Sequence, residues 1–379
     1  MVCPSCTLQQ EKNQPLRGIL EVLLTPTAGS STTLDKLDNN DLLNFLPVEK
    51  SFFPAIPVGN TPLWKPTNLR NRLGLKNLFI KDDTCNPTAS FKDRASFLVA
   101  AFATKHQLKN IVLASTGNAA SSMAGIGAAA GIKVTIFLPK TAPIAKIVQS
   151  LQYGANVITV DGNYDNAYDL SLEYSSTRGG FSRNTAYNPL TIEGKKSVSL
   201  EIARDLQSAP DYVYVPTGDG VILAGVYKGF RDLYDLKLIS KVPTIIAVQS
   251  EGSDAIHRAF KSGHFTEKAS STVADSICVD IPRNGFHAVK NLKKYGGQTI
   301  AVSDNDILSA QRELSSSTGL FTEPAAATAF AGLLAHKDQI SKDAKVVVLV
   351  TGHGLKDTAS ALKIVSPPAR AIKNLEELL

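Results

Sequence analysis

Short apolar runs alternate along the chain with longer stretches in which apolar residues recur every three or four positions. The first pattern predicts buried strands, and the second predicts amphipathic helices. We expect strands at 78–83, 110–114, 131–138, 156–160, 212–216, 244–249 and 345–350. Helices are expected to end near His106 and Ala130, to span 142–152, 163–176 and 192–206, and to begin at Glu323. Strands separated by helices form parallel sheets with right-handed crossovers, so the pattern predicts an α/β fold with ligands beyond the strands' carboxyl ends.

Two regions lack this alternation. Residues 26–41 are rich in Thr, Ser, Asp and Asn, which predicts a mobile connector. Residues 250–305 are less regular, and their spacing assigns them no chemistry.

Composition narrows the classes of protein that fit. The 379 residues suffice for two packed domains, and 43% hydrophobic residues is usual for a globular protein. The net charge of +6 comes from scattered Lys and Arg without basic blocks, which argues against nucleic acid as a partner. No apolar run approaches the ~18 residues of a membrane span, and the start lacks a basic segment followed by an apolar one. We therefore expect neither a membrane partner nor a secretory signal.

The four cysteines are Cys3, Cys6, Cys85 and Cys278. Two are close neighbours and two are isolated, a pattern typical of reduced thiols, so a cytoplasmic location is predicted. Cys3 and Cys6 form half of a zinc-ribbon pattern, but no second Cys pair or suitably placed His follows within ~20 residues. We expect a degenerate remnant and no metal site, with intramolecular zinc as the alternative.

The segment 86–95 (NPTASFKDRA) has the character of a turn that starts a helix. Ser90 is expected to be the N-cap, which leaves Lys92 in the first helical turn. The positive end of the helix dipole lowers the pKa of a lysine placed there, and a neutral amine is what Schiff-base chemistry requires. The alternative is an ordinary surface lysine beside a loop.

A glycine loop at 217–225 lies between a predicted strand and a helix. Such a loop presents backbone N–H groups and a helix N-terminus to a phosphate, and Gly218, Asp219 and Gly220 fit that role. A dinucleotide fingerprint would need glycine where Leu223 stands, and the lysine of a P-loop is missing. The Asp219 carboxylate would have to point away from a bound phosphate. A plain tight turn remains the alternative.

Two further loops follow strands. Ser115, Thr116, Gly117 and Asn118 combine small hydroxyls with backbone N–H groups at a helix start. They suit a substrate carboxylate, with Asn118 able to donate to a ring hydroxyl of a cofactor; a helix cap without a ligand is the alternative. Thr351, at another strand end, could hydrogen-bond a ring nitrogen.

Six segments together resemble fold-type II pyridoxal-phosphate (PLP) enzymes, and most closely the threonine synthases. They are 58–63, 86–95, 115–118, 216–225, 323–325 and 351–357. The resemblance implies that Lys92 carries PLP, that Asn118 bonds the ring oxygen, and that Thr351 bonds the pyridine nitrogen. It also implies that Gly218, Asp219, Gly220 and Val221 hold the PLP phosphate.

The same resemblance implies two doubly wound parallel-sheet domains with the active site between them, in a homodimer. We expect an N-terminal extension at 1–50, a large PLP-binding domain at 51–84 plus 186–365, a small domain at 85–185, and a tail at 366–379. The implied reaction converts O-phospho-L-homoserine and water to L-threonine and phosphate. The alternatives are a related eliminase, such as a threonine or serine dehydratase, and a PLP-binding regulatory relative without turnover.

One position departs from the family pattern. Many threonine synthases place an Arg two residues before a Glu-Gly pair, where it helps to bind the substrate phosphate, and here that position is Thr191. A hydroxyl does not replace a guanidinium opposite a dianion. Lys195, Lys196 or Arg183 could supply the charge.

Overall fold

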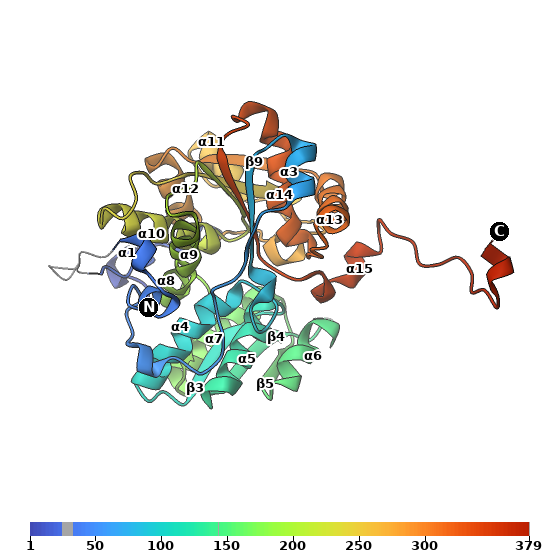
Figure 1. The fold of residues 1–379 in the computed structure, drawn as a ribbon. Helices are drawn as coiled ribbons and strands as arrows, with labels where there is room; N and C mark the ends of the chain where they lie inside the picture. The colour runs from blue at the N-terminus through green and yellow to red at the C-terminus, as the bar shows by residue number, and fades with distance from the viewer. Residues whose placement is uncertain (25–32, 143, 379) are drawn as a thin grey trace.

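The computed structural model describes residues 1–24, 33–142 and 144–378, and their strands form two sheets (Figure 1). The larger sheet has the order β1-β2-β10-β7-β8-β9 and the smaller the order β5-β4-β3-β6. All neighbours are parallel except β1 and β2. The strands are β1 Leu63–Trp64, β2 Asn77–Asp82, β3 Asn110–Ala114, β4 Lys133–Pro139, β5 Asn156–Val160, β6 Phe181–Ser182, β7 Tyr212–Pro216, β8 Thr244–Ser250, β9 Gln298–Val302 and β10 Lys345–Val350. The expected α/β fold is confirmed.

Helices cover both faces of each sheet. They are α1 Pro4–Thr7, α2 Asn39–Leu43, α3 Thr67–Leu73, α4 Lys92–Lys105, α5 Asn118–Ala130, α6 Ile144–Gln152, α7 Tyr164–Thr177, α8 Leu190–Lys195, α9 Ser197–Leu206, α10 Val221–Asp235, α11 Ala255–Ser262, α12 Gly285–Lys294, α13 Asp304–Thr318, α14 Pro324–His336 and α15 Thr358–Ala361. Alternate residues of β7 show how the larger sheet is packed. Val213 and Val215 face the cluster that includes α9, α10 and α12, whereas Tyr214 faces α13 and α14. Both faces are apolar because both are buried.

The smaller sheet is packed in the same way. Ile111 and Leu113 of β3 contact α4 and α5, and Val112 and Ala114 contact α7 on the opposite face. Helix α5 is rich in Gly and Ala because it lies very close to the sheet: a Cβ added at Gly127 would stand 2.4 Å from a methyl carbon of Val134. Close packing of this helix fixes the loop that precedes it.

Two expectations about helices are wrong. The helix expected at 192–206 is two helices, α8 and α9, separated at Lys196, whose backbone keeps nearly helical angles (φ −61°, ψ −23°). Ser90 does not cap α4: the helix begins at Lys92, and the buried Ser90 hydroxyl has no hydrogen-bond partner within the described residues. The Asp93 carboxylate instead fixes the turn, since it accepts hydrogen bonds from the backbone N–H and hydroxyl of Thr88 (2.7 and 2.5 Å).

The two irregular regions also differ from expectation. Residues 250–305 contain α11, α12 and the edge strand β9. Of the expected connector 26–41, residues 26–32 lie outside the described residues. The part from 33 onward contains a 3₁₀ turn, Leu34–Lys36, whose Leu34 is buried in the core of the larger sheet.

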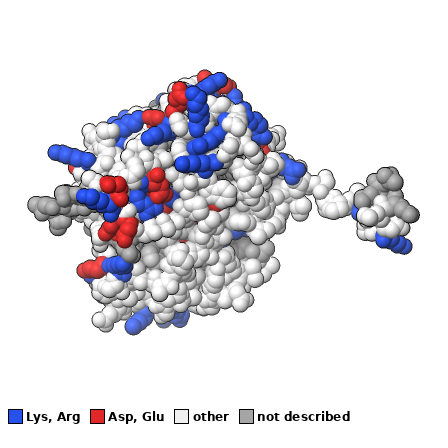
Figure 2. All heavy atoms as spheres, in the orientation of Figure 1, with Lys and Arg blue, Asp and Glu red and all other residues white. Residues whose placement is uncertain are grey.

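The proposed domain boundaries remain a prediction. The strands of the larger sheet fall within 51–84 and 186–365, and those of the smaller sheet within 85–185. Figure 1 shows the C-terminal residues leaving the body as an extended tail. Among the described residues no helix is long and apolar enough to cross a membrane. On the face drawn in Figure 2, Lys and Arg are interspersed with Asp and Glu and gather over the larger sheet, so this face presents no stripe of one charge.

Candidate active site

A cavity of about 160 Å³ lies between the two sheets, at the carboxyl ends of their strands. The smaller sheet contributes the loop after β3, the larger sheet contributes the loop after β7, and Lys92 joins them from the start of α4. A second cavity of about 200 Å³ adjoins the first and shares Gly117, Asn118, Asp275 and Ser276 with it. We call them the inner and the outer cavity. The inner cavity therefore brings together Lys92, the 115–118 loop and the 218–220 loop, which the sequence predicted separately.

Lys92 is the first residue of α4 and lines the inner cavity. Burial lowers the pKa of its amine, and the nearby charge of Arg183 lowers it further, while Asp219 and Glu323 oppose the shift. Desolvation disfavours the ammonium form, so the fold favours the neutral amine that was expected at this position. The largest cause is burial, where the sequence argument had pointed to the helix dipole.

Three segments hold Lys92 in place. Ser90 forms a bridge with Gly352, and the N–H of His353 donates to the carbonyl of Ala89 (3.1 Å). The N–H of Glu323 donates to the carbonyl of Gly352 (3.0 Å). A Cβ at Gly352 would stand 2.2 Å from a carboxylate oxygen of Glu323, so a side chain there would push this carboxylate aside. The lysine segment, the end of β10 and the start of α14 thus form one connected unit.

Thr351 belongs to this unit through its backbone. Its carbonyl accepts a hydrogen bond from the N–H of Phe91 (2.9 Å), which places it next to the residue that precedes Lys92. Its side chain does not line either cavity among the described residues. Its role toward a ring nitrogen remains a prediction.

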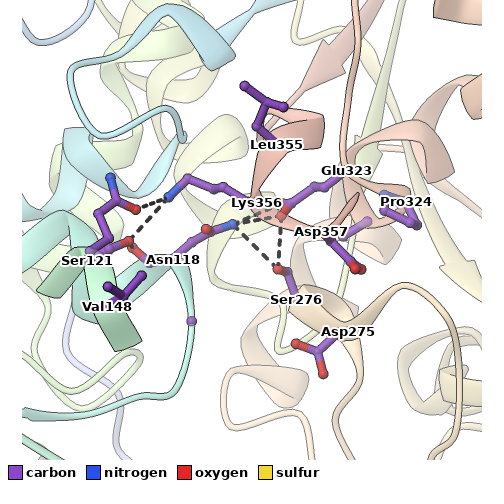
Figure 3. Close-up of a pocket in the computed structure, with 13 residues that line it drawn as sticks. Asn118, Ser121, Val148, Asp275, Ser276, Glu323, Pro324, Leu355, Lys356 and Asp357 are labelled. Carbon is purple, nitrogen blue, oxygen red and sulfur yellow. Dashed lines mark hydrogen bonds between the residues drawn. The ribbon is translucent and has the colours of Figure 1, made fainter. Parts of the chain in front are cut away.

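Asn118 and Glu323 face each other where the two cavities meet (Figure 3). The amide of Asn118 donates to both carboxylate oxygens of Glu323 (2.9 and 3.1 Å), and the hydroxyl of Ser276 lies 3.3 Å from the same carboxylate. Burial raises the pKa of Glu323, although the bond from Asn118 and the charges of Lys92 and Lys356 oppose this. Sequence reasoning gave Glu323 only the role of starting a helix and missed it as a site residue, as it missed Ser276 and Lys356.

The loop of Ser115, Thr116 and Gly117 lines the inner cavity as expected. No side chain caps α5, whose N-cap is Gly117, and a Cβ at Gly117 would meet nothing within 4 Å. Within the described residues, the backbone N–H groups of Asn118 and Ala119 donate to no protein acceptor. These donors stand at a helix N-terminus beside open space, where an anionic group binds favourably.

The glycine loop after β7 also lines the inner cavity. A Cβ at Gly218 would stand 2.8 Å from the Cα of Ile277, and Gly220 has φ +86°, so both positions require glycine. The Asp219 carboxylate accepts the N–H of Val221 (3.0 Å), one of the donors assigned to the phosphate. The carboxylate therefore lies at the start of α10, where the phosphate was expected, although the sequence analysis required it to point away from a bound phosphate. It satisfies an N–H that has no acceptor within the helix. The N–H groups of Gly218, Asp219 and Gly220 have no protein acceptor among the described residues.

The three basic residues considered in place of an arginine at 191 differ in position. Lys196 is ion-paired with Glu193 and with Asp232 (2.8 Å), so the structure does not bring it to the cavity, contrary to expectation. Arg183 and Lys195 are fully buried, and the charges of Lys92 and Asp219 act on Lys195.

These residues fit pyridoxal phosphate. A lysine amine of lowered pKa stands in a cavity with N–H donors at the starts of two helices that have no protein acceptor among the described residues. The buried Arg183 acts on this amine, and the amine acts on the buried Lys195. Lys92 would hold the aldehyde, and Gly218, Asp219 and Gly220 would hold the phosphate through backbone N–H groups.

Comparison with known proteins agrees with this chemistry. Residues 55–352 match the family described as pyridoxal-phosphate dependent enzyme, so the chain belongs to the PLP-dependent enzymes. Within them, it is 35% identical over 340 residues to a threonine synthase of Methanosarcina acetivorans, with 88% of this chain and 84% of that protein covered. It is 33% identical over 341 residues to a threonine synthase of Mycobacterium tuberculosis, with 88% and 93% covered. The chain belongs to the threonine synthase family.

Solved structures confirm the fold-type II architecture. Threonine deaminase isoform 2 from Solanum lycopersicum superposes with a TM-score of 0.71 at 23% identity, covering 90% of this chain and 93% of that one. Maize serine racemase gives a TM-score of 0.69 at 24% identity, with 78% and 88% covered. At these identities the likeness concerns the fold alone.

Proposed function

We propose that this enzyme converts O-phospho-L-homoserine and water to L-threonine and phosphate. The observation that carries the proposal is that Lys92, the 115–118 loop and the 217–220 loop line one cavity in a chain of the threonine synthase family. In the overall reaction, the Cγ–O bond breaks and its electron pair leaves on the phosphate. Cγ gains a proton, and Cβ exchanges a hydrogen for the hydroxyl group of water.

Each part of the site has a task in this reaction. Bound PLP supplies an electron sink for the substrate's Cα. The Lys92 amine holds the cofactor and then takes and returns protons at Cα and Cβ, which requires its neutral form. The free N–H groups at the start of α5 bind the substrate carboxylate. Asn118 and Glu323, which are hydrogen-bonded to each other, orient the bound cofactor and substrate next to Lys92.

A second candidate is an eliminase acting on threonine or serine. The observation that favours it is Thr191, whose hydroxyl donates to the carbonyl of Asn188 (2.8 Å), just before α8, and so is not directed to a substrate phosphate. The two candidates differ in whether the leaving group is a phosphate or a hydroxyl.

Assays of the purified holoenzyme with phosphohomoserine, threonine, serine and phosphoserine separate the candidates. We expect threonine and phosphate in equal amounts from phosphohomoserine, and no ammonia from threonine or serine. Borohydride should fix PLP to the peptide containing Lys92, and Lys92→Ala should abolish both labelling and turnover. Ammonia from threonine or serine, without turnover of phosphohomoserine, would establish the eliminase.

We propose in addition that the enzyme is a cytoplasmic homodimer. Support for the cytoplasm comes from the four cysteines, which are all free thiols. The homodimer rests on family resemblance, and light scattering of the purified protein should give twice the mass of the 40.5 kDa chain.

A further inference from the structure

Arg183 and Lys195 are buried cations with few partners. Arg183 is 0% exposed, and its Nε makes no hydrogen bond within the described residues. Its terminal nitrogens lie 3.1 Å from the hydroxyl of Thr185 and 3.4 Å from that of Ser96. Lys195 is 1% exposed, and its amine has one protein acceptor in the described chain, the carbonyl of Thr191 (3.1 Å). Neither Arg183 nor Lys195 forms an ion pair within 4.0 Å with any described carboxylate.

Other buried cations of the same fold are paired. Arg94 bonds Asp83 and Glu201, and Lys196 bonds Glu193 and Asp232. Removing a charge from water is unfavourable unless a counter-charge replaces the lost hydration. The missing counter-charge at Arg183 and Lys195 therefore points to an anion that binds there.

The charge of Arg183 acts on Lys195, and both side chains are buried behind the residues that line the inner cavity in the described chain. Burial lowers the pKa of Lys195 well below its ordinary value, and the charges of Arg183 and Lys92 lower it further. Burial also lowers the pKa of Arg183, to about 10, against the opposing charges of Asp219, Tyr164 and Asp93. Asp93 is already bonded to Thr88, and Asp219 to Val221. An additional anion would relieve the mutual repulsion of the cations.

Position connects this pair to the substrate. Thr185, which accepts the bond from Arg183, lines the inner cavity together with Lys92. Lys195 follows Thr191 by one turn of α8, and its amine reaches back to the carbonyl of Thr191. Residues four apart share a helix face, so the Lys195 amine lies over Thr191 on the same side of α8.

We infer that Arg183 and Lys195, with the hydroxyl of Thr185, form the binding seat for the phosphate group of the substrate. The choice of substrate rests on the proposed function, while the cofactor's phosphate has its own donors in the 217–220 loop. A phosphate offers three terminal oxygens and about two negative charges, which match a guanidinium fork, an ammonium group and a hydroxyl. The seat holds the phosphate during binding and again after its bond to Cγ has broken.

Calorimetric titration of the holoenzyme with inorganic phosphate tests the seat without turnover. We expect Arg183→Met and Lys195→Met each to weaken phosphate binding at least tenfold, while PLP stays at one per chain. Arg183→Lys and Lys195→Arg should recover part of the affinity and show that the loss does not come from misfolding. Arg178→Met and Lys133→Met remove exposed charges from the same part of the chain and should change nothing.

The outcomes separate the seat from the proposed function. Phosphate affinity that stays unchanged in both Met variants, or wild-type holoenzyme that binds no phosphate, overturns the seat. Loss of PLP with unchanged phosphate affinity in the remaining holoenzyme assigns the cations to the cofactor and also overturns it. If phosphate binds as expected but phosphohomoserine is not turned over, the seat stands and the proposed function fails. If both Met variants turn over phosphohomoserine with an unchanged KM, the proposed function stands and the seat fails.

Discussion

Arg94 ties the two sheets together, and its replacement by Met should be strongly destabilising. Its guanidinium bonds both carboxylate oxygens of Asp83 (2.6 and 2.9 Å) and both of Glu201 (2.5 and 2.8 Å). It also bonds the hydroxyls of Thr61 and Ser197 (3.1 and 2.9 Å). Arg94 lies on α4, which packs on the smaller sheet. Asp83 directly follows β2 of the larger sheet, and Glu201 lies on α9, which packs on that sheet.

Most of the stability lost in Arg94→Met can be assigned to one of its partners, Asp83. Without Arg94, Glu201 keeps the amine of Lys81 (2.7 Å) and the N–H of Asn60 (2.8 Å). Asp83, whose side chain is 0% exposed, keeps the hydroxyl of Thr61 (2.7 Å) as its one side-chain partner among the described residues. Breaking a buried ion pair from one side costs about 3–5 kcal/mol, and most of it should fall on Asp83. Since domains are stable by roughly 5–15 kcal/mol, the variant should lose a large part of its stability.

The loss should also depend on pH. Burial alone would raise the pKa of Glu201, but the charges of Arg94 and Lys81 hold it well below its usual range. A carboxyl group of lowered pKa contributes stability above its unfolded value of about 4.3 and loses it as the pH falls. That contribution shrinks in Arg94→Met. The difference in the free energy of unfolding between wild type and variant should therefore narrow below about pH 4.3.

Equilibrium urea unfolding at equal PLP saturation measures the effect. Asp83→Asn in the Arg94→Met background should regain stability, because it removes the unpaired charge. Arg72→Met is the matched control: Arg72 is 50% exposed and paired with Glu313, so the change should cost about 0–1 kcal/mol. A loss in Arg94→Met no larger than that of this control would refute the reasoning.

Three further predictions concern the site and the N-terminus. Gly352→Ala should displace the Glu323 carboxylate and lower kcat by about tenfold in steady-state assays while PLP stays bound, because positioning is lost; unchanged kcat would contradict this. Glu323→Gln removes a charge that raises the pKa of Lys92, so the pH midpoint for PLP association with the apoenzyme, followed by absorbance, should move to lower pH; a shift to higher pH would disprove it. The double variant Cys3→Ser, Cys6→Ser should keep the melting temperature of the wild type, and metal analysis of the wild type should find less than one zinc per chain. One zinc per chain in the wild type that is lost in the double variant would show a metal site.

Sequence periodicity predicted β2, β3, β4, β7, β8 and β10 because these strands are buried on both faces and form continuous apolar runs. It also predicted the more exposed β5, but it missed β1 and β6, which have two residues each and carry no period. It failed in 250–305 for physical reasons. β9 is an edge strand whose residues are mostly half-buried, so its pattern is weak. Helix α12 begins at Gly285, where a Cβ would stand 2.6 Å from a ring carbon of Phe265, a contact that no local pattern reveals.

The sequence predicted those site residues that lie together in one loop. It missed those that come together only through contacts between distant segments. Lys92 and the glycine loop each carry a local signal. The bond between Asn118 and Glu323 joins residues 205 positions apart, and the pairing of Lys196 depends on Asp232 of another helix. Only the packed fold shows that Lys196 is neutralised while Arg183 and Lys195 are not.

The bonds that join residues 89–91 to the end of β10 have a mechanical consequence. The lysine belongs to the helix that packs on the smaller sheet, yet the residues directly before it are fastened to the larger one. If one sheet rotates against the other while these bonds hold, the residues that the bonds join move least, because displacement grows with distance from the axis. The cofactor lysine would stay almost stationary during such a rotation, while α6, whose Val148 lines the outer cavity, would be displaced with the smaller sheet.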